Sequence, residues 1–261
     1  MMSWIHGRGA LPGLLLLLGV IGCGDTTAGT GDRGRVVYEL DTHYLSKSSS
    51  LKEVDILTGY AQTIRTRLTQ EGARAVESPA TLTHRVKPSQ GVELEVVEDG
   101  YDVQDVRIRV SVPGDYSLET RQGGALFDRI SLQFDKPESL EVITWVRRSM
   151  DSAFGQVGSE GRIQVDEGTQ VTVIPVPKGA EGKRILGDFE AEITGNPSWA
   201  VVAARNIMGV YEQWVWSSGE PVNLVFIEPG EVEVKVRDAV NDVERTLLFT
   251  VAESERRPAS P

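Results

Sequence analysis

An internal repeat constrains the fold more than any other feature of the sequence. Residues 106–134 align with residues 222–250 without gaps, at a constant offset of 116 residues. Alternating apolar positions, a Pro-Gly-acid turn and an acid–arginine pair agree in order: Val106, Ile108, Val110, Pro113, Gly114, Asp115, Tyr116, Leu118, Asp128, Arg129 and Leu132 fall on Val222, Leu224, Phe226, Pro229, Gly230, Glu231, Val232, Val234, Glu244, Arg245 and Leu248. Proline fixes φ and glycine accepts a positive φ, so each unit reads strand, turn, strand, loop, strand. Because solenoid repeats have periods of about 20 to 50 residues, this longer offset indicates duplicated domains.

The rest of the chain carries short apolar segments separated by turn residues. Residues 106–112 alternate apolar and polar side chains, which is typical of a half-buried strand. Strands are predicted at 60–68, 80–86, 92–97, 106–112, 116–120, 127–134, 162–165, 170–176, 189–193, 200–204, 211–216, 222–227, 231–236 and 245–251. This spacing predicts an all-β sandwich or barrel, and no segment has a convincing helical period.

The predicted strands fall into two groups. Lys136-Pro137 marks a break, so we expect one β-sandwich domain over residues 36–136 and a second over residues 137–252. Residues 23–35 are small and polar and are expected to form a flexible tether. Residues 253–261 form a polar, proline-bearing tail that is expected to be disordered.

One stretch of the second unit resembles a known family. Residues 229–238 (Pro-Gly-Glu-Val-Glu-Val-Lys-Val-Arg-Asp) follow residues 214–219 (Trp-Val-Trp-Ser-Ser-Gly). This pattern is similar to the second half of bacterial immunoglobulin-like or PKD-type domains. The resemblance is strongest over residues 162–252 and weaker over residues 36–135, where no Trp-Ser-Ser occurs. It implies two tandem immunoglobulin-like β-sandwiches and specifies no ligand.

The amino-terminal residues predict the cellular location of the protein. Residues 1–22 contain one arginine and an apolar run of about half the roughly 20 residues that a membrane-spanning helix needs, which is typical of a signal peptide. Val20-Ile21-Gly22-Cys23 resembles the lipobox of bacterial lipoproteins. The resemblance implies cleavage after Gly22, a diacylglyceryl group on Cys23 and an amino-terminal acyl chain such as palmitate. An ordinary signal peptide with an incidental cysteine is the alternative.

If Cys23 is lipidated, the membrane is the first partner, because several acyl chains together hold a protein on a bilayer. Gly24 stands where enterobacteria place an aspartate for inner-membrane retention, which favours the outer membrane of the cell envelope. The mature charge is −12, since residues 1–22 contain one arginine and no acid. Nucleic-acid binding is therefore not expected.

Composition also limits the chemistry. Cys23 is the only cysteine, so the mature chain has no disulfide and no thiolate nucleophile. Its histidines, His43 and His84, lack metalloprotease spacing, and each is expected to have a structural role. Residues 98–105 hold four acids, which predicts an acidic turn or, alternatively, a calcium site. We therefore expect no catalytic, cofactor-binding or metal-ligating residue.

Trp214 and Trp216 share one face of a predicted strand, which favours core packing over stacking on sugar rings. The sequence favours a nonenzymatic envelope lipoprotein with a binding or structural role and a protein or glycan partner. The alternative is a carbohydrate-active protein, either a glycan-binding module or a hydrolase with a carboxylate pair.

Overall fold

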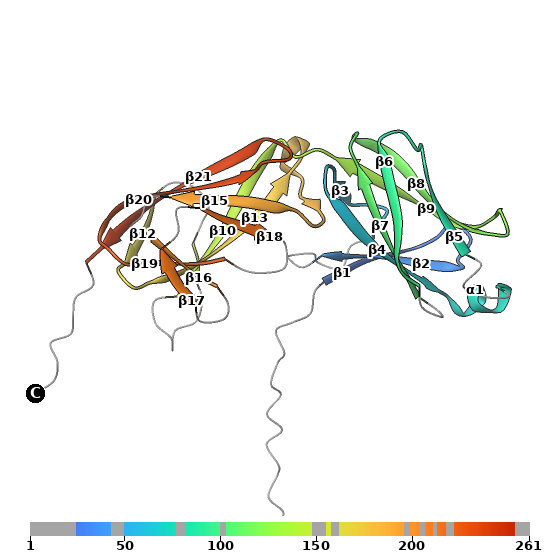
Figure 1. Ribbon diagram of the computed structural model, residues 1–261, viewed down its shortest axis with the longest axis horizontal. Coiled ribbons are helices and arrows are strands. Elements are labelled where there is room, and N and C mark those ends of the chain that lie inside the picture. Colours follow the sequence, from blue (N-terminus) through green and yellow to red (C-terminus); the bar gives the residue numbers. More distant parts are fainter. Residues whose placement is uncertain are drawn as a thin grey trace, which may run out of the picture.

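A computed structural model describes most of the chain between Asp25 and Glu253. The described residues are 25–42, 50–76, 82–99, 103–147, 155–157, 162–195, 199–203, 207–210, 213–217 and 222–253. The predicted signal peptide (1–22), Cys23 and His43 lie outside them, as does the predicted tail except Glu253. Figure 1 shows two β-sandwiches arranged end to end along the long axis, so the predicted fold class is confirmed.

Domain 1 consists of two sheets. The first has the strand order β1-β2-β4-β7-β6, with bounds Asp25–Thr30, Val36–Thr42, Ala61–Leu68, Val103–Val110 and Val92–Asp99. The second has the order β14-β3-β9-β8-β5, with bounds Ile185–Leu186, Asp55–Leu57, Ala125–Asp135, Gly114–Gln122 and Leu82–Lys87. Strand β14 lies within residues 137–252, all of which were predicted to form the second domain. It nevertheless pairs with β3 in a sheet of domain 1.

Domain 2 is built in the same way. Its first sheet has the order β11-β10-β13-β19-β16-β17, with bounds Gly155–Val157, Ser139–Arg147, Gln170–Lys178, Val222–Phe226, Trp199–Ala203 and Ile207–Val210. Its second sheet has the order β12-β21-β20-β15-β18, with bounds Arg162–Asp166, Val243–Ala252, Gly230–Asp238, Glu190–Gly195 and Gln213–Ser217.

The strand order of both domains is immunoglobulin-like. Across the first sheet of domain 1, β2, β4, β7 and β6 take the places of strands A, B, E and D of that fold, and β10, β13, β19 and β16 do so in domain 2. The opposite sheets hold strands C, F and G in both domains, each with a parallel strand beside the last one, β3 on β9 and β12 on β21. The Tyr116 hydroxyl donates a 2.7 Å hydrogen bond to the Val112 carbonyl, which is the tyrosine corner of this fold.

The 116-residue repeat corresponds to the last three strands of each domain. Strands β7, β8 and β9 are equivalent to β19, β20 and β21, and β8 and β20 coincide without any shift. Gly114 and Gly230 begin those two strands with φ of 148° and 143°, a region that favours glycine. The predicted duplication and its Pro-Gly turn are therefore confirmed.

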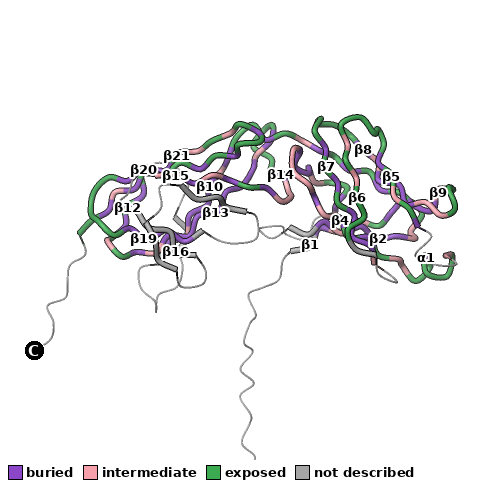
Figure 2. Tube along the Cα trace, in the orientation of Figure 1, coloured by how far each residue is buried: buried purple, intermediate pink, exposed green. Residues whose placement is uncertain are grey.

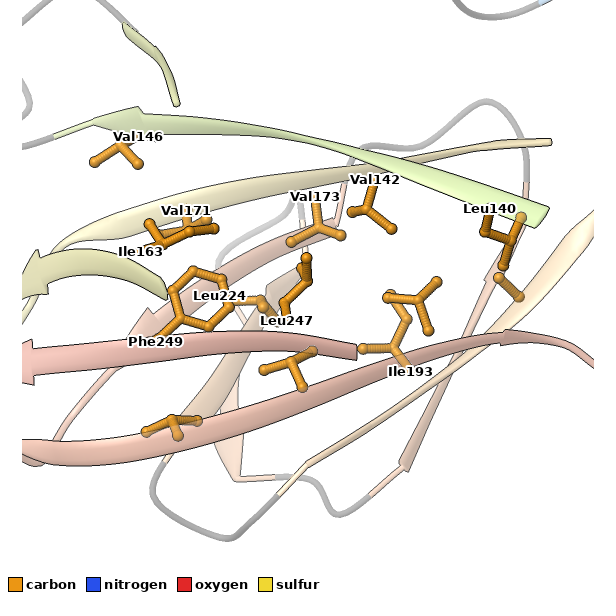
Figure 3. Packing of buried hydrophobic residues seen from close by; sticks show 14 of the residues in the cluster. Leu140, Val142, Val146, Ile163, Val171, Val173, Ile193, Leu224, Leu247 and Phe249 are labelled. Atoms are coloured by element: carbon orange, nitrogen blue, oxygen red, sulfur yellow. The ribbon is translucent and has the colours of Figure 1, made fainter. Parts of the chain in front are cut away.

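Each sandwich has its own hydrophobic core. Buried and exposed residues alternate along the strands, as Figure 2 shows for β20 and β21. In domain 2, side chains of one sheet (Val171, Val173, Leu224) face those of the other (Ile193, Leu247, Phe249), as Figure 3 shows. Burial of such side chains contributes about 1.5–3 kcal/mol each, which is the main stabilising term in a chain without disulfides.

Two predictions about local structure are wrong. Residues 25–30, expected within a flexible tether, form β1 and pair with β2 along their whole length. Their small side chains allow close packing: Thr27 is fully buried, and a Cβ on Gly29 would lie 2.8 Å from Ile130 Cδ1. A short helix, α1 (Gln70–Ala75), was also missed, because six residues are too few for a visible period.

Candidate functional site

The two domains meet through a polar junction in which Gln62 and Asp238 are fully buried. The Tyr60 hydroxyl, from domain 1, donates a 2.6 Å hydrogen bond to Asp238 Oδ1 in domain 2 and lies 3.0 Å from the Glu190 carbonyl. Burial, and then the Asp238 carboxylate, raise the pKa of Tyr60 well above its ordinary value. The hydroxyl therefore stays protonated and acts as a donor.

Asp238 lies fully buried at the end of β20 and has donors for both carboxylate oxygens. Oδ1 also accepts hydrogen bonds from the backbone N–H groups of Val240 and Asn241, both at 3.1 Å. Oδ2 accepts one from Asn241 Nδ2 at 2.9 Å. A buried carboxylate is tolerated only when such donors satisfy it. Tyr60 of domain 1 therefore stabilises Asp238 together with the backbone N–H groups of the turn that follows it in domain 2.

A second set of contacts joins β4 to the loop after β14. Gln62 is fully buried; its Nε2 donates to the Asp188 carbonyl at 2.9 Å, and its Oε1 accepts from the Asp188 N–H at 2.7 Å. Gly187 precedes this loop residue with φ of 133°, and a Cβ there would lie 2.4 Å from Gln62 Oε1. Glycine is therefore required at this position by both backbone conformation and space.

Backbone and apolar contacts complete the junction. Strand β14, which lies between β13 and β15 of domain 2 in the sequence, pairs in parallel with β3 of domain 1, as Ile185 with Asp55 and Leu186 with Ile56. Lys183 Nζ lies 2.8 Å from Asp55 Oδ2, and Asp55 is buried. Leu57 of β3 belongs to the core of domain 2, while Leu186 packs against the core of domain 1. Figure 2 shows β14 between the two domains. The junction therefore fixes the two sandwiches relative to each other.

A hollow of about 450 Å³ opens beside the junction on the outer face of the first sheet of domain 1. Its walls come from β4, β6 and β7 and from Asp188. Two cross-strand ion pairs line it: Arg109–Glu93 at 3.7 Å and Arg107–Glu95 at 3.9 Å. The glutamate side chains are 78% and 68% exposed, so water solvates them. Such a surface suits binding of a polar or charged group better than acid catalysis, which relies on a shielded carboxyl group.

The first strand begins at the junction end of domain 1. Asp25 pairs with Thr42, and β2 runs antiparallel to β4, so Thr42 lies toward the end of β4 that begins at Ala61. Figure 1 shows β1 near the junction and β6 across the same sheet from it. Asp25 is two residues after Cys23 in the sequence. The chain therefore enters the folded unit near its middle and not at one end.

The structure gives His84 a structural environment. Its Nε2 lies 2.7 Å from Gln104 Oε1, and its Nδ1 lies 3.3 Å from Thr120 Oγ1. Thr120 in turn shares a 2.9 Å hydrogen bond with the hydroxyl of the buried Tyr38. Burial raises the pKa of Tyr38 well above its ordinary value, so its hydroxyl stays protonated and uncharged in this hydrogen-bonded group.

The acidic residues at 98–105 belong to a strand connection. Glu98 pairs with Asp105 and Asp99 pairs with Gln104 in the β6–β7 ladder, and residues 100–102 lie outside the described segments. Asp105 binds the Arg65 guanidinium through two contacts of 3.0 and 3.2 Å. No group of three or more potential metal-ligating side chains occurs within the part of the chain that the structure describes.

Trp214 and Trp216 lie on β18, opposite Ile193 and Ala191 of β15. Their side chains, like Cys23 and His43, are outside what the structure describes. Within the described segments, no helix is long and apolar enough to cross a membrane.

The junction residues Tyr60, Gln62, Asp188 and Asp238 were not predicted from the sequence. The Asp-Ala-Val-Asn sequence at 238–241 is a turn signal, and Gly187-Asp188 is another. Both mark turns, but neither indicates that the turn faces another domain.

No protein-family model matches the chain, and no curated protein matches it in sequence. Among solved structures, the chain is similar to domains 5–6 of the S-layer protein SbsC, with 13% identity and a TM-score of 0.29 over 82% of this chain and 98% of that one. It is similar to the Yersinia pseudotuberculosis adhesin InvE, with 15% identity and a TM-score of 0.27 over 85% of this chain and 61% of that one. It is also similar to a β-glycosidase from Bacteroides vulgatus, with 14% identity and a TM-score of 0.28 over 82% and 24% of the two chains. Likeness at this level carries no statement about what this chain binds or does.

Proposed function

We propose that the protein is a bacterial envelope lipoprotein with a nonenzymatic binding or structural role, anchored through acyl chains on Cys23. One observation carries this proposal: β1 begins at Asp25, two residues after Cys23, and pairs with β2 along its whole length. A folded domain therefore starts directly behind the residue that the lipobox marks for acylation. Such an arrangement suits a module held at a membrane surface.

The same geometry supports a particular orientation. Two residues span at most about 7 Å, so acyl chains on Cys23 would enter the bilayer close to the domain junction. Both sandwiches would then lie along the membrane, with β1 at the membrane side and β6 on the far side of the sheet. The negative net charge of the chain adds no attraction to anionic headgroups, so the acyl chains would supply the binding.

The fixed junction supports a role in which two surfaces are presented together. Tyr60–Asp238, Gln62–Asp188 and Lys183–Asp55 join the domains by side chains, and β14–β3 joins them by backbone. We propose a protein or glycan of the envelope as the partner. Gly24 favours sorting to the outer membrane.

The hollow beside the junction is a candidate site for a carboxylate-pair hydrolase, because Glu93, Glu95 and Asp188 line it. The two glutamates are exposed, and each lies within 4 Å of an arginine, which does not favour this alternative. Activity against a panel of polysaccharides that is lost in Glu93→Gln or Glu95→Gln would favour it.

Metabolic labelling with a radioactive fatty acid tests the anchor. The wild-type protein is expected to take up label and to sediment with outer membranes, and the Cys23→Ala variant to take up none. The Gly24→Asp variant is a control: it should keep the label and move to inner membranes. Equal labelling of wild type and Cys23→Ala would contradict the proposal.

A further inference from the structure

Strand β6 is an open edge of domain 1. It ends the sheet order β1-β2-β4-β7-β6, and among the described residues only β7 pairs with it. From Val92 to Val96 the pairing is regular, and the bulge lies beyond this stretch, between Val96 and Glu98. Alternate N–H and C=O groups of an edge strand point away from the sheet, where they can pair with another strand.

The apolar side of this edge is incompletely covered. Val92 and Leu94 pack against the core but are only partly buried, and Val96 is 43% exposed. The edge strand of the opposite sheet, β5, differs, because its core-facing Leu82 and Val86 are buried. The incompletely covered apolar side chains therefore lie along β6 and not along β5. The hollow beside the junction opens at the same strand, lined by Glu93, Leu94 and Glu95.

Domain 2 shows what covers the equivalent edge in the duplicated unit. There β16 takes the place of β6, and β17 pairs with it antiparallel, from Ala200–Val210 to Ala203–Ile207. Residues 204–221 connect β16 to β19 and supply this strand, whereas only residues 100–102 connect β6 to β7. Domain 1 thus has the edge without the segment that covers it in its duplicate.

The charged residues of β6 and β7 indicate what kind of strand can pair with β6. Glu93 and Glu95 stand opposite Arg109 and Arg107 of β7, so acidic and basic residues alternate from β6 to β7 on this face. An added strand with basic residues beside Glu93 and Glu95 would continue the alternation. Antiparallel pairing of β6 with β6 of a second copy centred on Leu94 would place Glu93 opposite Glu95, and like charges directly opposite are destabilising.

We propose that β6 binds an extended segment of a partner protein, in which basic residues alternate with apolar ones, as an added strand. Backbone hydrogen bonds to β6 supply the affinity, and Glu93 and Glu95 supply the selectivity for basic residues. The apolar side chains of the segment cover Val92, Leu94 and Val96. The edge lies across the sheet from β1, and the inference holds whether or not Cys23 carries lipid.

Hydrogen–deuterium exchange on the full chain carrying Cys23→Ser tests the proposal in solution. The probes are synthetic peptides as long as β6 that alternate valine with lysine, serine or glutamate. The lysine peptide is expected to slow exchange of the outward-facing β6 amides by about tenfold or more, and the glutamate peptide to have no effect. In the Glu93→Lys/Glu95→Lys variant, the affinity for the lysine peptide should fall by about tenfold, since two opposite-charge pairs become like-charge pairs.

The matched control is Glu231→Lys/Glu233→Lys on β20, which makes the same charge change on a strand that lies between β21 and β15 in its sheet and is not an edge strand. This variant should bind the lysine peptide as the parent chain does. The proposal is overturned if no peptide slows exchange at β6, or if the lysine and glutamate peptides act alike. It is also overturned if the double variant at Glu93 and Glu95 binds unchanged, or if β6 becomes protected with rising protein concentration alone, which would identify a second copy as the occupant.

Discussion

Tyr60 and Asp238 are separated by 178 residues in the sequence, yet a 2.6 Å hydrogen bond joins them across the domain junction. The Tyr60 ring also makes an edge-on contact with Phe189 of domain 2, with centroids 6.3 Å apart. One side chain of domain 1 is thus held by a buried carboxylate and by an aromatic ring of its neighbour. The contacts of Tyr60 across the junction are therefore of the same kind as contacts inside a folded domain.

Tyr60→Phe tests the hydrogen bond while keeping the ring. We expect a loss of about 1–3 kcal/mol in the free energy of unfolding, because a buried carboxylate loses one of its donors. Urea unfolding measures the loss, and small-angle scattering should show a wider range of domain orientations.

The matched control is Tyr116→Phe, which removes the 2.7 Å hydrogen bond to Val112 inside domain 1. It should lower stability by about 1 kcal/mol and leave the scattering curve unchanged. If Tyr60→Phe instead unfolds at the wild-type urea concentration with an unchanged curve, the hydrogen bond does not hold the junction.

Gly187→Ala tests the close approach to Gln62. A Cβ at Gly187 would lie 2.4 Å from Gln62 Oε1, so the loop or the glutamine must move in addition to the strain of φ at 133°. Gly182→Ala supplies the control, because φ there is 72° and nothing lies within 4 Å of the added Cβ. We expect about 1–2 kcal/mol of loss for Gly182→Ala and a clearly larger loss for Gly187→Ala, measured by urea unfolding. Equal losses would mean that the Gln62–Asp188 contact is not tight.

Gly29→Ala tests whether β1 belongs to the sandwich. The added Cβ would meet Ile130 Cδ1 at 2.8 Å, and overpacking of this kind costs about 1–3 kcal/mol. Thermal unfolding should show the loss, and Ile130→Val in the same chain should relieve part of it by removing the clashing methyl group. A flexible tether would give no change for Gly29→Ala, which would contradict the pairing of β1 with β2.

Glu119 predicts a pH dependence of stability. A hydrogen bond from Lys87, at 2.8 Å, and another from Arg121, at 2.7 Å, lower the pKa of Glu119 below its ordinary value of 4.5. The unfolded chain then binds the proton more readily, so the stabilisation is present above pH 4.5 and is lost as the pH falls through the lower folded-state pKa. Urea unfolding of wild type and Glu119→Gln should show a gap near neutral pH that narrows in acid. The exposed Glu93→Gln variant should show little gap at any pH, and a Glu119→Gln gap that stays constant with pH would refute the ion-pair account.

Local patterns in the sequence predicted the sandwiches well, because alternation and Pro-Gly turns reflect pairing within each domain. The offset between Gly114 and Gly230 located β8 and β20 and their equivalence. The tether prediction was wrong for β1, because Thr27 and Gly29 are small residues whose role is close packing, and small residues also mark flexible segments. The partner of Gln62 could not be predicted, since Gln62 and Asp188 are 126 residues apart and meet only where the two folded domains contact each other.

Neutron reflectometry of the acylated protein on a supported bilayer tests the central claim, a rigid pair of sandwiches anchored beside its junction. An anchor beside the junction predicts a protein layer as thick as the molecule is across its long axis from β1 to β6 in Figure 1, directly against the headgroups. Insertion of a Gly-Ser linker between Gly24 and Asp25 should separate this layer from the bilayer. A wild-type layer as thick as the long axis would show a molecule standing on one end and would contradict the account.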